Sequence, residues 1–127
     1  MISGCAGFIG ANLILQRLRH PPDDLVVNFD ALTYAGNLGS LEDMKNLPNY
    51  RFFHGDLQNT LEISKAFSEH NIEAVNYLAA ESHVDRSIHG PDDFIETYVT
   101  ATFNLLETAS EFWGDELIKH RILHVSY

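Results

Sequence analysis

The segment Ser3-Gly4-Cys5-Ala6-Gly7-Phe8-Ile9-Gly10 places three glycines at intervals of three residues, directly before a stretch with helical periodicity. Glycines at this spacing allow a tight turn, a close approach of the backbone to a phosphate, and close packing of a helix on a sheet. The helix that follows directs its free N–H groups and the positive end of its dipole toward the same point. The segment therefore predicts a strand-to-helix turn that holds a phosphate group.

Asp30 supports this interpretation, which a glycine triplet alone would not secure, since such triplets occur in many loops. Asp30 follows an apolar run at residues 25–29 and comes 20 residues after Gly10. In a dinucleotide-binding fold, an acidic residue at this distance accepts hydrogen bonds from the ribose hydroxyls of the adenosine half. A carboxylate there repels a 2′-phosphate, and the next residue is the neutral Ala31. The pattern therefore favours NAD over NADP as the cofactor.

The rest of the chain alternates β-branched or aromatic runs with segments of helical periodicity. The runs that predict strands are residues 25–29, 50–54, 74–78 and 121–125. The apolar spacing predicts helices around residues 11–18 and 63–70, a longer helix from Pro91 to a stop at Gly114, and a short one over 38–47. Because strands and helices alternate, we expect an α/β fold: a Rossmann-type doubly wound parallel sheet with helices on both faces.

The composition limits the class of protein. The chain has 127 residues, of which 45% are hydrophobic, and a net charge of −10, which fits one folded domain. A strongly acidic chain lacks the clustered Lys and Arg that bind a nucleic acid or an anionic membrane. No apolar run approaches the length of a membrane span, and the single Cys5 cannot form an internal disulfide. We therefore expect a cytoplasmic domain with neither a nucleic-acid nor a membrane partner.

Three further motifs resemble those of one enzyme family. They are Asp-Ala-Leu-Thr-Tyr-Ala-Gly-Asn-Leu at residues 30–38, Gly-Asp-Leu at 55–57, and Leu-Ala-Ala-Glu-Ser-His-Val-Asp-Arg-Ser-Ile at 78–88. Together with the glycine turn they are similar to the dTDP-glucose 4,6-dehydratases, which belong to the extended short-chain dehydrogenase/reductases. The similarity runs along essentially the whole chain, and the third motif is its most specific part.

The resemblance also implies roles for individual residues. It places the glycine turn at the pyrophosphate of NAD, the segment after Asp30 around the adenosine ribose, and the segment after Leu78 under the ribose and nicotinamide. It places Asp56 and Leu57 at the adenine. The cofactor-binding residues implied in this way are Gly4, Gly7, Phe8, Ile9, Gly10, Asp30, Ala31, Leu32, Thr33, Asp56, Leu57, Leu78, Ala79, Ala80, Glu81 and Thr97, and Ser82 is the implied substrate contact.

For a complete enzyme, the resemblance implies NAD-dependent dehydration of dTDP-glucose to dTDP-4-keto-6-deoxyglucose. This is a hydro-lyase reaction of deoxysugar (rhamnose-type) metabolism, and the resemblance implies that a homodimer performs it. Two alternatives stay open on the sequence: a nucleotide-sugar 4-epimerase or decarboxylase of the same superfamily, and a non-catalytic NAD-binding fragment.

The chain departs from the family pattern at both ends. Only Met1 and Ile2 precede Ser3, so we expect the first strand to be shorter than the usual length of about 5–6 residues. The family continues after its last matching strand with Ser-Thr-Asp-Glu and later a Tyr-x-x-x-Lys pair, whereas this sequence ends at Tyr127. We therefore expect residues 1–127 to form the N-terminal part of an NAD-binding Rossmann domain. We expect them to have no second domain, no catalytic residue and negligible dehydratase activity.

Other residue patterns carry weaker signals. The sequence contains no His/Cys cluster, and its His-x-x-x-His pair, His120 and His124, lies along a predicted strand rather than on a helix, so a metal site is not expected. Cys5 lies in the phosphate turn, where backbone donors could lower a thiol pKa, but a space-filling role is the favoured interpretation. The long predicted helix carries an apolar stripe of Phe103, Leu106, Phe112 and Trp113. This stripe is equally compatible with burial against the sheet and with a dimer interface.

Overall fold

A computed structural model of the chain describes residues 1–5, 7–19, 24–32, 39, 42, 45–79, 92 and 95–125. The strands in chain order are β1 (Ile2–Ser3), β2 (Val26–Asp30), β3 (Tyr50–His54), β4 (Ala74–Tyr77) and β5 (Arg121–His124). The α-helices are α1 (Phe8–Arg19), α2 (Thr60–His70) and α5 (Ala101–Trp113). A π-helical turn (Glu96–Thr100) leads into α5, and a 3-10 helix (Gly114–Lys119) leads out of it.

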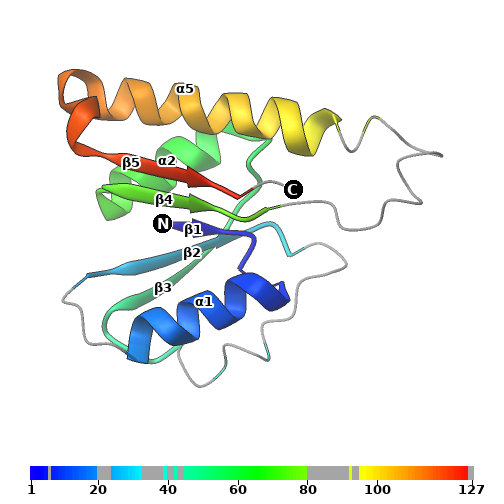
Figure 1. The fold of residues 1–127 in the computed structure, drawn as a ribbon, viewed down its shortest axis with the longest axis vertical. Coiled ribbons are helices and arrows are strands. Elements are labelled where there is room, and N and C mark those ends of the chain that lie inside the picture. The colour runs from blue at the N-terminus through cyan, green and yellow to red at the C-terminus, as the bar shows by residue number, and fades with distance from the viewer. Residues whose placement is uncertain are drawn as a thin grey trace.

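The five strands form one parallel sheet in the order β3-β2-β1-β4-β5. Helix α1 covers one face of this sheet, and α2 and α5 cover the other (Figure 1). The chain runs from β1 outward through β2 to β3 and then crosses back past β1 to β4. Right-handed crossovers in opposite directions put helices on opposite faces, which is the doubly wound arrangement. The predicted fold class is confirmed.

The central strand β1 is two residues long, as the sequence predicted. Ile2 pairs with Asn28 of β2 on one side and with Asn76 of β4 on the other. Met1 extends the contact with β4, because its terminal ammonium group donates to the Ala74 carbonyl at 2.7 Å and its own carbonyl accepts from the Asn76 N–H at 2.9 Å. The short strand thus delivers the glycine turn directly to the carboxyl edge of the sheet.

The four longer strands begin and end within one residue of their predicted limits, and α1 and α2 contain their predicted segments. Helix α5 ends at Gly114 as predicted, where φ is +50°. The π-helical turn before α5 was not predicted, because no spacing of apolar residues distinguishes it from an α-helix. The predicted helix start at Pro91 and half of the residues predicted as a helix over 38–47 lie outside the described residues. Of the other half, Gly39 and Glu42 have 3-10 geometry, and Lys45 and Asn46 form a turn, so no helix reaches residue 47.

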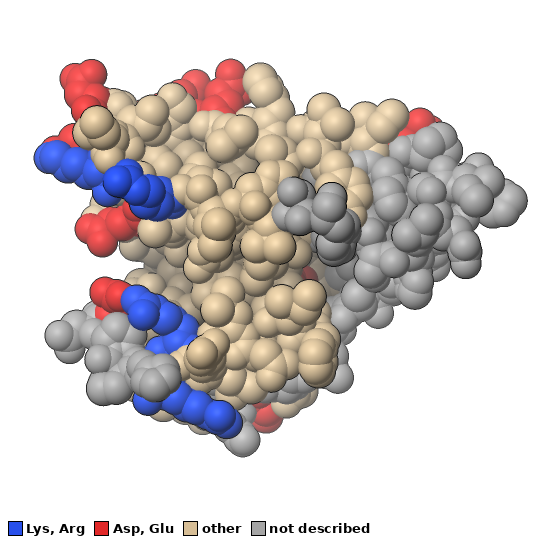
Figure 2. Space-filling model, viewed as in Figure 1, with Lys and Arg blue, Asp and Glu red and all other residues tan. Residues whose placement is uncertain are grey.

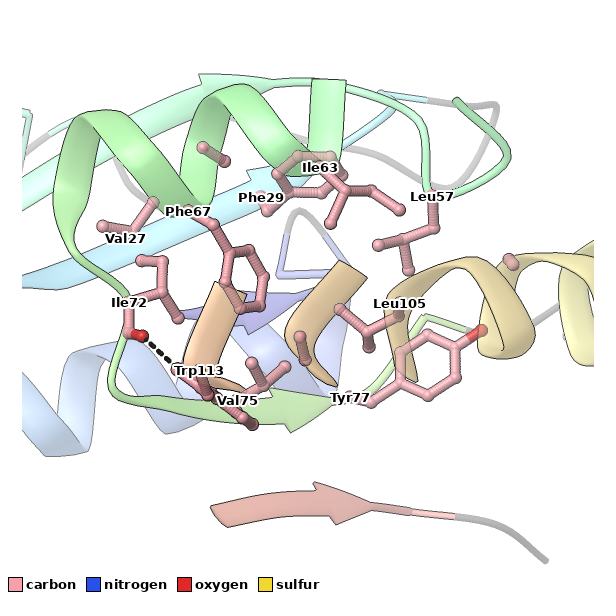
Figure 3. Packing of buried hydrophobic residues seen from close by; sticks show 13 residues of the cluster. Val27, Phe29, Leu57, Ile63, Phe67, Ile72, Val75, Tyr77, Leu105 and Trp113 are labelled. Carbon is pink, nitrogen blue, oxygen red and sulfur yellow. Dashed lines mark hydrogen bonds between the residues drawn. The ribbon is translucent and has the colours of Figure 1, made fainter. Parts of the chain in front are cut away.

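The larger part of the core lies between the sheet and the pair α2 and α5. Figure 3 shows its side chains converging from both helices onto the strands. The Trp113 indole lies in this cluster and donates from Nε1 to the Ile72 carbonyl at 2.7 Å. The buried residues of the cluster are Val27, Phe29, Leu57, Ile63, Ala66, Phe67, Ile72, Val75, Tyr77, Ala101, Leu105, Ala109 and Trp113.

A smaller cluster fills the space between the sheet and α1. It consists of Ile2, Cys5, Ala11, Ile14, Val26 and Tyr50. All five residues of β2 are buried, because alternate side chains enter the two clusters on opposite faces. For this reason the segment from Leu25 to Phe29 is a nearly continuous apolar run, interrupted only at Asn28, rather than an alternating one.

Helix α5 also presents apolar side chains to solvent. Trp113 is buried, whereas the exposed fractions of Phe103, Leu106 and Phe112 are 59%, 50% and 41%. Burial against the sheet therefore accounts for Trp113 alone among the four residues of the predicted stripe. Among the helices described, none combines the length and the apolar character needed to cross a membrane.

Candidate functional site at the carboxyl edge of the sheet

Four loops that the sequence singled out lie along one edge of the sheet. Because all five strands are parallel, the segments that follow β1, β2, β3 and β4 leave from the same edge (Figure 1). In open α/β sheets this edge binds ligands next to the point where the strand order reverses. Here that point lies between β1 and β4, because the chain leaves β1 toward β2 and leaves β4 toward β5.

Two of the three glycines in the turn are required by the packing of the chain itself. Gly4 has a φ of +70°, and a Cβ there would lie 2.6 Å from the Cα of Ala79. A Cβ on Gly10 would lie 2.5 Å from the Cα of Cys5 and 2.7 Å from the Gly4 carbonyl oxygen. These distances are too short for real contacts, so Gly4 seats the turn against the end of β4 and Gly10 seats α1 against the turn.

Gly7 differs from the other two glycines. Among the described residues, a Cβ there would have one near neighbour, the Gly4 carbonyl oxygen at 3.4 Å, which is ordinary contact. The protein could therefore accommodate an alanine at position 7. The absence of a side chain leaves space directly before the first turn of α1, where a ligand can approach the backbone.

The start of α1 fits an anionic ligand. Its first turn contains no acidic residue, so the partial positive charge of its N–H groups is not neutralised by a side chain of the helix. Phe8 and Ile9 in this turn are 86% and 68% exposed, which is unusual for apolar residues next to a buried turn. On the face that Figure 2 shows, the Lys and Arg side chains lie toward the amino ends of the strands. The glycine turn, the end of β2, the start of the β3–α2 loop and residues 78–79 contain no Lys or Arg.

Asp30 lies next to the glycine turn. The Gly4 N–H donates to the carbonyl of Phe29 at 3.1 Å, so the turn and the end of β2 are neighbours in the sheet. Asp30 is 9% exposed, and its Oδ1 accepts from the Leu32 N–H at 2.8 Å. This bond closes a turn in which Leu32 takes a φ of +52°. The parallel pairing of β1 with β2 thus brings the carboxylate beside the glycine turn.

The loop after β3 presents a second carboxylate. Asp56 is exposed, its N–H donates to Glu62 Oε2 at 2.7 Å, and its Oδ1 accepts from the Gln58 N–H at 2.9 Å. Leu57, the next residue, is buried in the larger core cluster. The loop is fixed by Asn104 of α5, whose amide donates to two of its carbonyls. Asn104 was not among the residues predicted from the sequence, where its signal was an amide on the inward face of an apolar helix.

The remaining predicted site residues are described in part. Leu78 and Ala79 are half-buried after β4, and the Leu78 N–H lies 3.3 Å from the Ser3 carbonyl oxygen. Thr97 belongs to the π-helical turn before α5. Four predicted residues lie outside the described part of the chain: Thr33, Ala80, Glu81 and Ser82.

Cys5 is fully buried, and burial, reinforced by the charge of Asp30, raises the pKa of its thiol. This direction is opposite to that of a reactive thiolate, so the space-filling interpretation of Cys5 is supported. Burial likewise raises the pKa of Tyr50, against the effect of the hydrogen bond that its hydroxyl accepts from Asn28 Nδ2 at 2.9 Å. Within the described part of the chain, no three His, Cys, Asp or Glu side chains are grouped so that they could hold a metal ion.

The sequence of the whole chain decides the family. The model of the family described as GDP-mannose 4,6 dehydratase matches residues 1–126. The chain belongs to this family. Its relatives include the dTDP-glucose 4,6-dehydratase of Salmonella typhimurium LT2, which is 45% identical over 99% of this chain and 36% of its own length. The resemblance to dTDP-glucose 4,6-dehydratases that the motifs indicated is therefore confirmed.

Solved structures show the same relationship. The dTDP-glucose 4,6-dehydratase DesIV of Streptomyces venezuelae, solved with NAD bound, matches 87% of this chain with a TM-score of 0.80 and 39% identity. The UDP-Glc/GlcNAc 4-epimerase of Campylobacter jejuni matches 87% with a TM-score of 0.78 and 28% identity. The match covers 35% of the DesIV chain, so this member of the GDP-mannose 4,6 dehydratase family spans about a third of the proteins that it resembles.

Proposed function

We propose that residues 1–127 form the N-terminal, NAD-binding part of a nucleotide-sugar 4,6-dehydratase that converts dTDP-glucose to dTDP-4-keto-6-deoxyglucose. The observation that carries the proposal is the arrangement at Gly7. The packing of the described residues does not require position 7 to lack a side chain. Its absence leaves space at the positive, N-terminal end of α1, and Asp30 lies on the neighbouring strand β2. A group with two phosphates next to a ribose has the charge and the hydroxyls that such a site would bind.

Each loop at the carboxyl edge has a proposed part in holding NAD. The diphosphate lies against Gly7 and the first turn of α1, which donates backbone N–H groups. Asp30 accepts hydrogen bonds from the adenosine ribose, and Asp56 accepts one from the amino group of adenine. Leu57 offers only its backbone to the base, because its side chain is buried in the core. Leu78, Ala79, Ala80, Glu81 and Thr97 continue the site toward the nicotinamide, and Ser82 reaches the sugar nucleotide. When bound, NAD supplies the hydride acceptor and donor of the reaction.

The preference for NAD over NADP follows from the surroundings of Asp30. Its carboxylate is held in place by the Leu32 N–H, and the next two residues, Ala31 and Leu32, carry no positive charge. A 2′-phosphate on the ribose would meet this carboxylate without a cation to compensate it. We therefore propose that repulsion between the Asp30 carboxylate and the 2′-phosphate selects against NADP.

We also propose that the complete enzyme is a cytoplasmic homodimer that uses the outer face of α5. Val99, Phe103 and Leu106 are 61%, 59% and 50% exposed, and their spacing of four and three residues puts them on one stripe. An apolar stripe of this kind is typical of a helix that packs against another helix.

A 4-epimerase of the same superfamily is the second candidate, because the Campylobacter jejuni enzyme shares this fold at 28% identity. The greater identity to DesIV, 39%, favours the dehydratase. The two reactions are distinguished by product when the whole enzyme is supplied with dTDP-glucose: a 4-keto-6-deoxy sugar from a dehydratase, and an inverted 4-hydroxyl from an epimerase.

The cofactor part of the proposal is tested by calorimetric titration of the chain with NAD and with NADP. We expect NAD to bind more tightly, and Asp30→Asn to reduce the preference by about tenfold, since it removes the charge but keeps an oxygen for the Leu32 N–H. Asp24→Asn is the matched control: it changes the net charge equally, at an exposed residue that pairs with Arg17 at 2.6 Å. No binding of NAD, or an unchanged preference in Asp30→Asn, would refute the proposal.

A further inference from the structure

Asn104 connects two parts of the fold that are far apart in the sequence. It lies on α5, is 8% exposed, and directs its side-chain amide toward the loop between β3 and α2. Its Nδ2 donates to the Leu57 carbonyl at 3.2 Å and to the Gln58 carbonyl at 3.0 Å. Both amide hydrogens are therefore used on two consecutive carbonyls of one loop.

The other bonds of this loop are local. Asp56 uses its Oδ1 for the Gln58 N–H and its own N–H for Glu62 of α2, and its carbonyl accepts from the Asn59 N–H at 3.0 Å. These contacts set the shape of the loop but do not fix it relative to α5. Asn104 supplies that connection from 46 residues further along the chain.

Because the hydrogen bond from Asn104 to the Leu57 carbonyl is buried, it holds the loop in one position. The Leu57 side chain enters the core beside Leu105 of α5 (Figure 3), so its carbonyl faces Asn104 from a fixed direction. A buried carbonyl that loses its donor keeps its full desolvation cost, so the loop would move toward water to recover a bond. Such a movement would carry Asp56, one residue away, with it.

We infer that Asn104 is a positioning residue for recognition of the adenine base. It holds the β3–α2 loop where the Asp56 carboxylate meets the amino group of adenine, without contacting the cofactor itself. The Oδ1 atom of Asp56 accepts from the Gln58 N–H, so Oδ2 is the oxygen that we place at the amino group of adenine. The inference rests on the proposed NAD site and names a determinant of its selectivity for the base.

The test compares NAD with nicotinamide hypoxanthine dinucleotide, in which an oxo group replaces the amino group of adenine. A site that accepts a hydrogen bond from the amino group discriminates against an analogue that cannot donate it. We expect the unsubstituted chain to prefer NAD, and Asn104→Leu to lower the ratio of the two affinities by about fivefold or more. Thr108→Val is the matched control, because Thr108 is a buried polar residue one turn further along the same helix.

The ratio separates positioning from stability, because a loss of folded protein lowers both affinities equally. Asn104→Ala, which leaves room for water to bond to the two carbonyls, is the second variant, and it should lower the ratio as well. An unchanged ratio in a folded Asn104 variant overturns this inference alone. Failure of both variants to fold overturns it too, since Asn104 then supports the fold as a whole. If the unsubstituted chain does not bind NAD, the proposed function fails, and the inference fails with it.

Discussion

Alanine substitutions at Gly7 and Gly10 should have different effects. The first should weaken NAD binding, and the second should lower the stability of the fold. Gly7→Ala adds a methyl group whose nearest neighbour is the Gly4 carbonyl oxygen at 3.4 Å. This is an ordinary contact, so the free energy of unfolding should change by less than about 1 kcal/mol. The methyl group would occupy the space proposed for the diphosphate. Overpacking of a fitted site costs about 1–3 kcal/mol, so the affinity for NAD should fall by roughly 10- to 100-fold.

Gly10→Ala should behave in the opposite way. Its Cβ would lie 2.5 Å from the Cα of Cys5. The Cα is a backbone atom and no side-chain rotation moves a Cβ, so neither atom can turn aside. The whole turn must shift, and we expect a loss of stability of about 1–3 kcal/mol or more. The affinity for NAD should then fall together with the folded fraction.

Urea unfolding and calorimetry measure the two quantities separately. The single tryptophan, Trp113, is buried in the larger core cluster, so its fluorescence reports unfolding of the sheet with α2 and α5. NAD affinity is measured by titration at a temperature where each variant is folded. If Gly7→Ala binds NAD as well as the unsubstituted chain does, the proposed place of the diphosphate is wrong. If Gly10→Ala is as stable as the unsubstituted chain, the steric argument for the turn is wrong.

Three further predictions concern the core and the outer face of α5. Trp113→Phe removes part of the ring and the donor of the 2.7 Å bond to the Ile72 carbonyl. It should lower the free energy of unfolding by about 2–4 kcal/mol in urea titrations. A loss below about 0.5 kcal/mol would contradict this role of Trp113 in the core. Burial raises the pKa of Tyr77 above its ordinary 10.0, so above pH 10 the folded chain holds a proton that the unfolded chain releases, and stability falls as the pH rises. Unfolding midpoints measured across this range should fall less in Tyr77→Phe, and an identical fall would refute the assignment. Phe103 is 59% exposed, so Phe103→Glu should change the free energy of unfolding by less than about 0.5 kcal/mol. In sedimentation of the complete enzyme it should abolish self-association. An unchanged dimer would exclude this stripe from the interface.

The strands and helices could be predicted closely because their signals are local. The residues of β3 form an aromatic-rich run that fits a pleated strand, and Gly114 ends α5 because it can take a φ of +50°. The π-helical turn Glu96–Thr100 could not be predicted in this way, since an extra residue in one turn leaves the local composition unchanged.

Those features of the candidate site that depend on the spacing of residues along the chain could be predicted from the sequence. The three glycines, Asp30 and Asp56 were all identified, and the structure brings the loops that carry them to one edge. The different roles of the glycines were not predictable. A Cβ at Gly4 would meet the backbone of Ala79, whereas a Cβ at Gly7 would make only an ordinary contact. The clash at Gly4 arises from the pairing of β1 with β4, which brings together residues 75 positions apart in the chain.

The amino-acid sequence by itself determined the order of strands and helices, the glycine turn and the family, because each depends on residues close together in the chain or on their identity alone. The tertiary structure decided which of these residues act on one another. The parallel pairing of β1 with β2 placed Asp30 beside Gly4, and the packing of α5 on α2 placed Asn104 against the loop after β3. Such contacts arise only when distant segments are brought together by burial of the core, so no local pattern of residues encodes them.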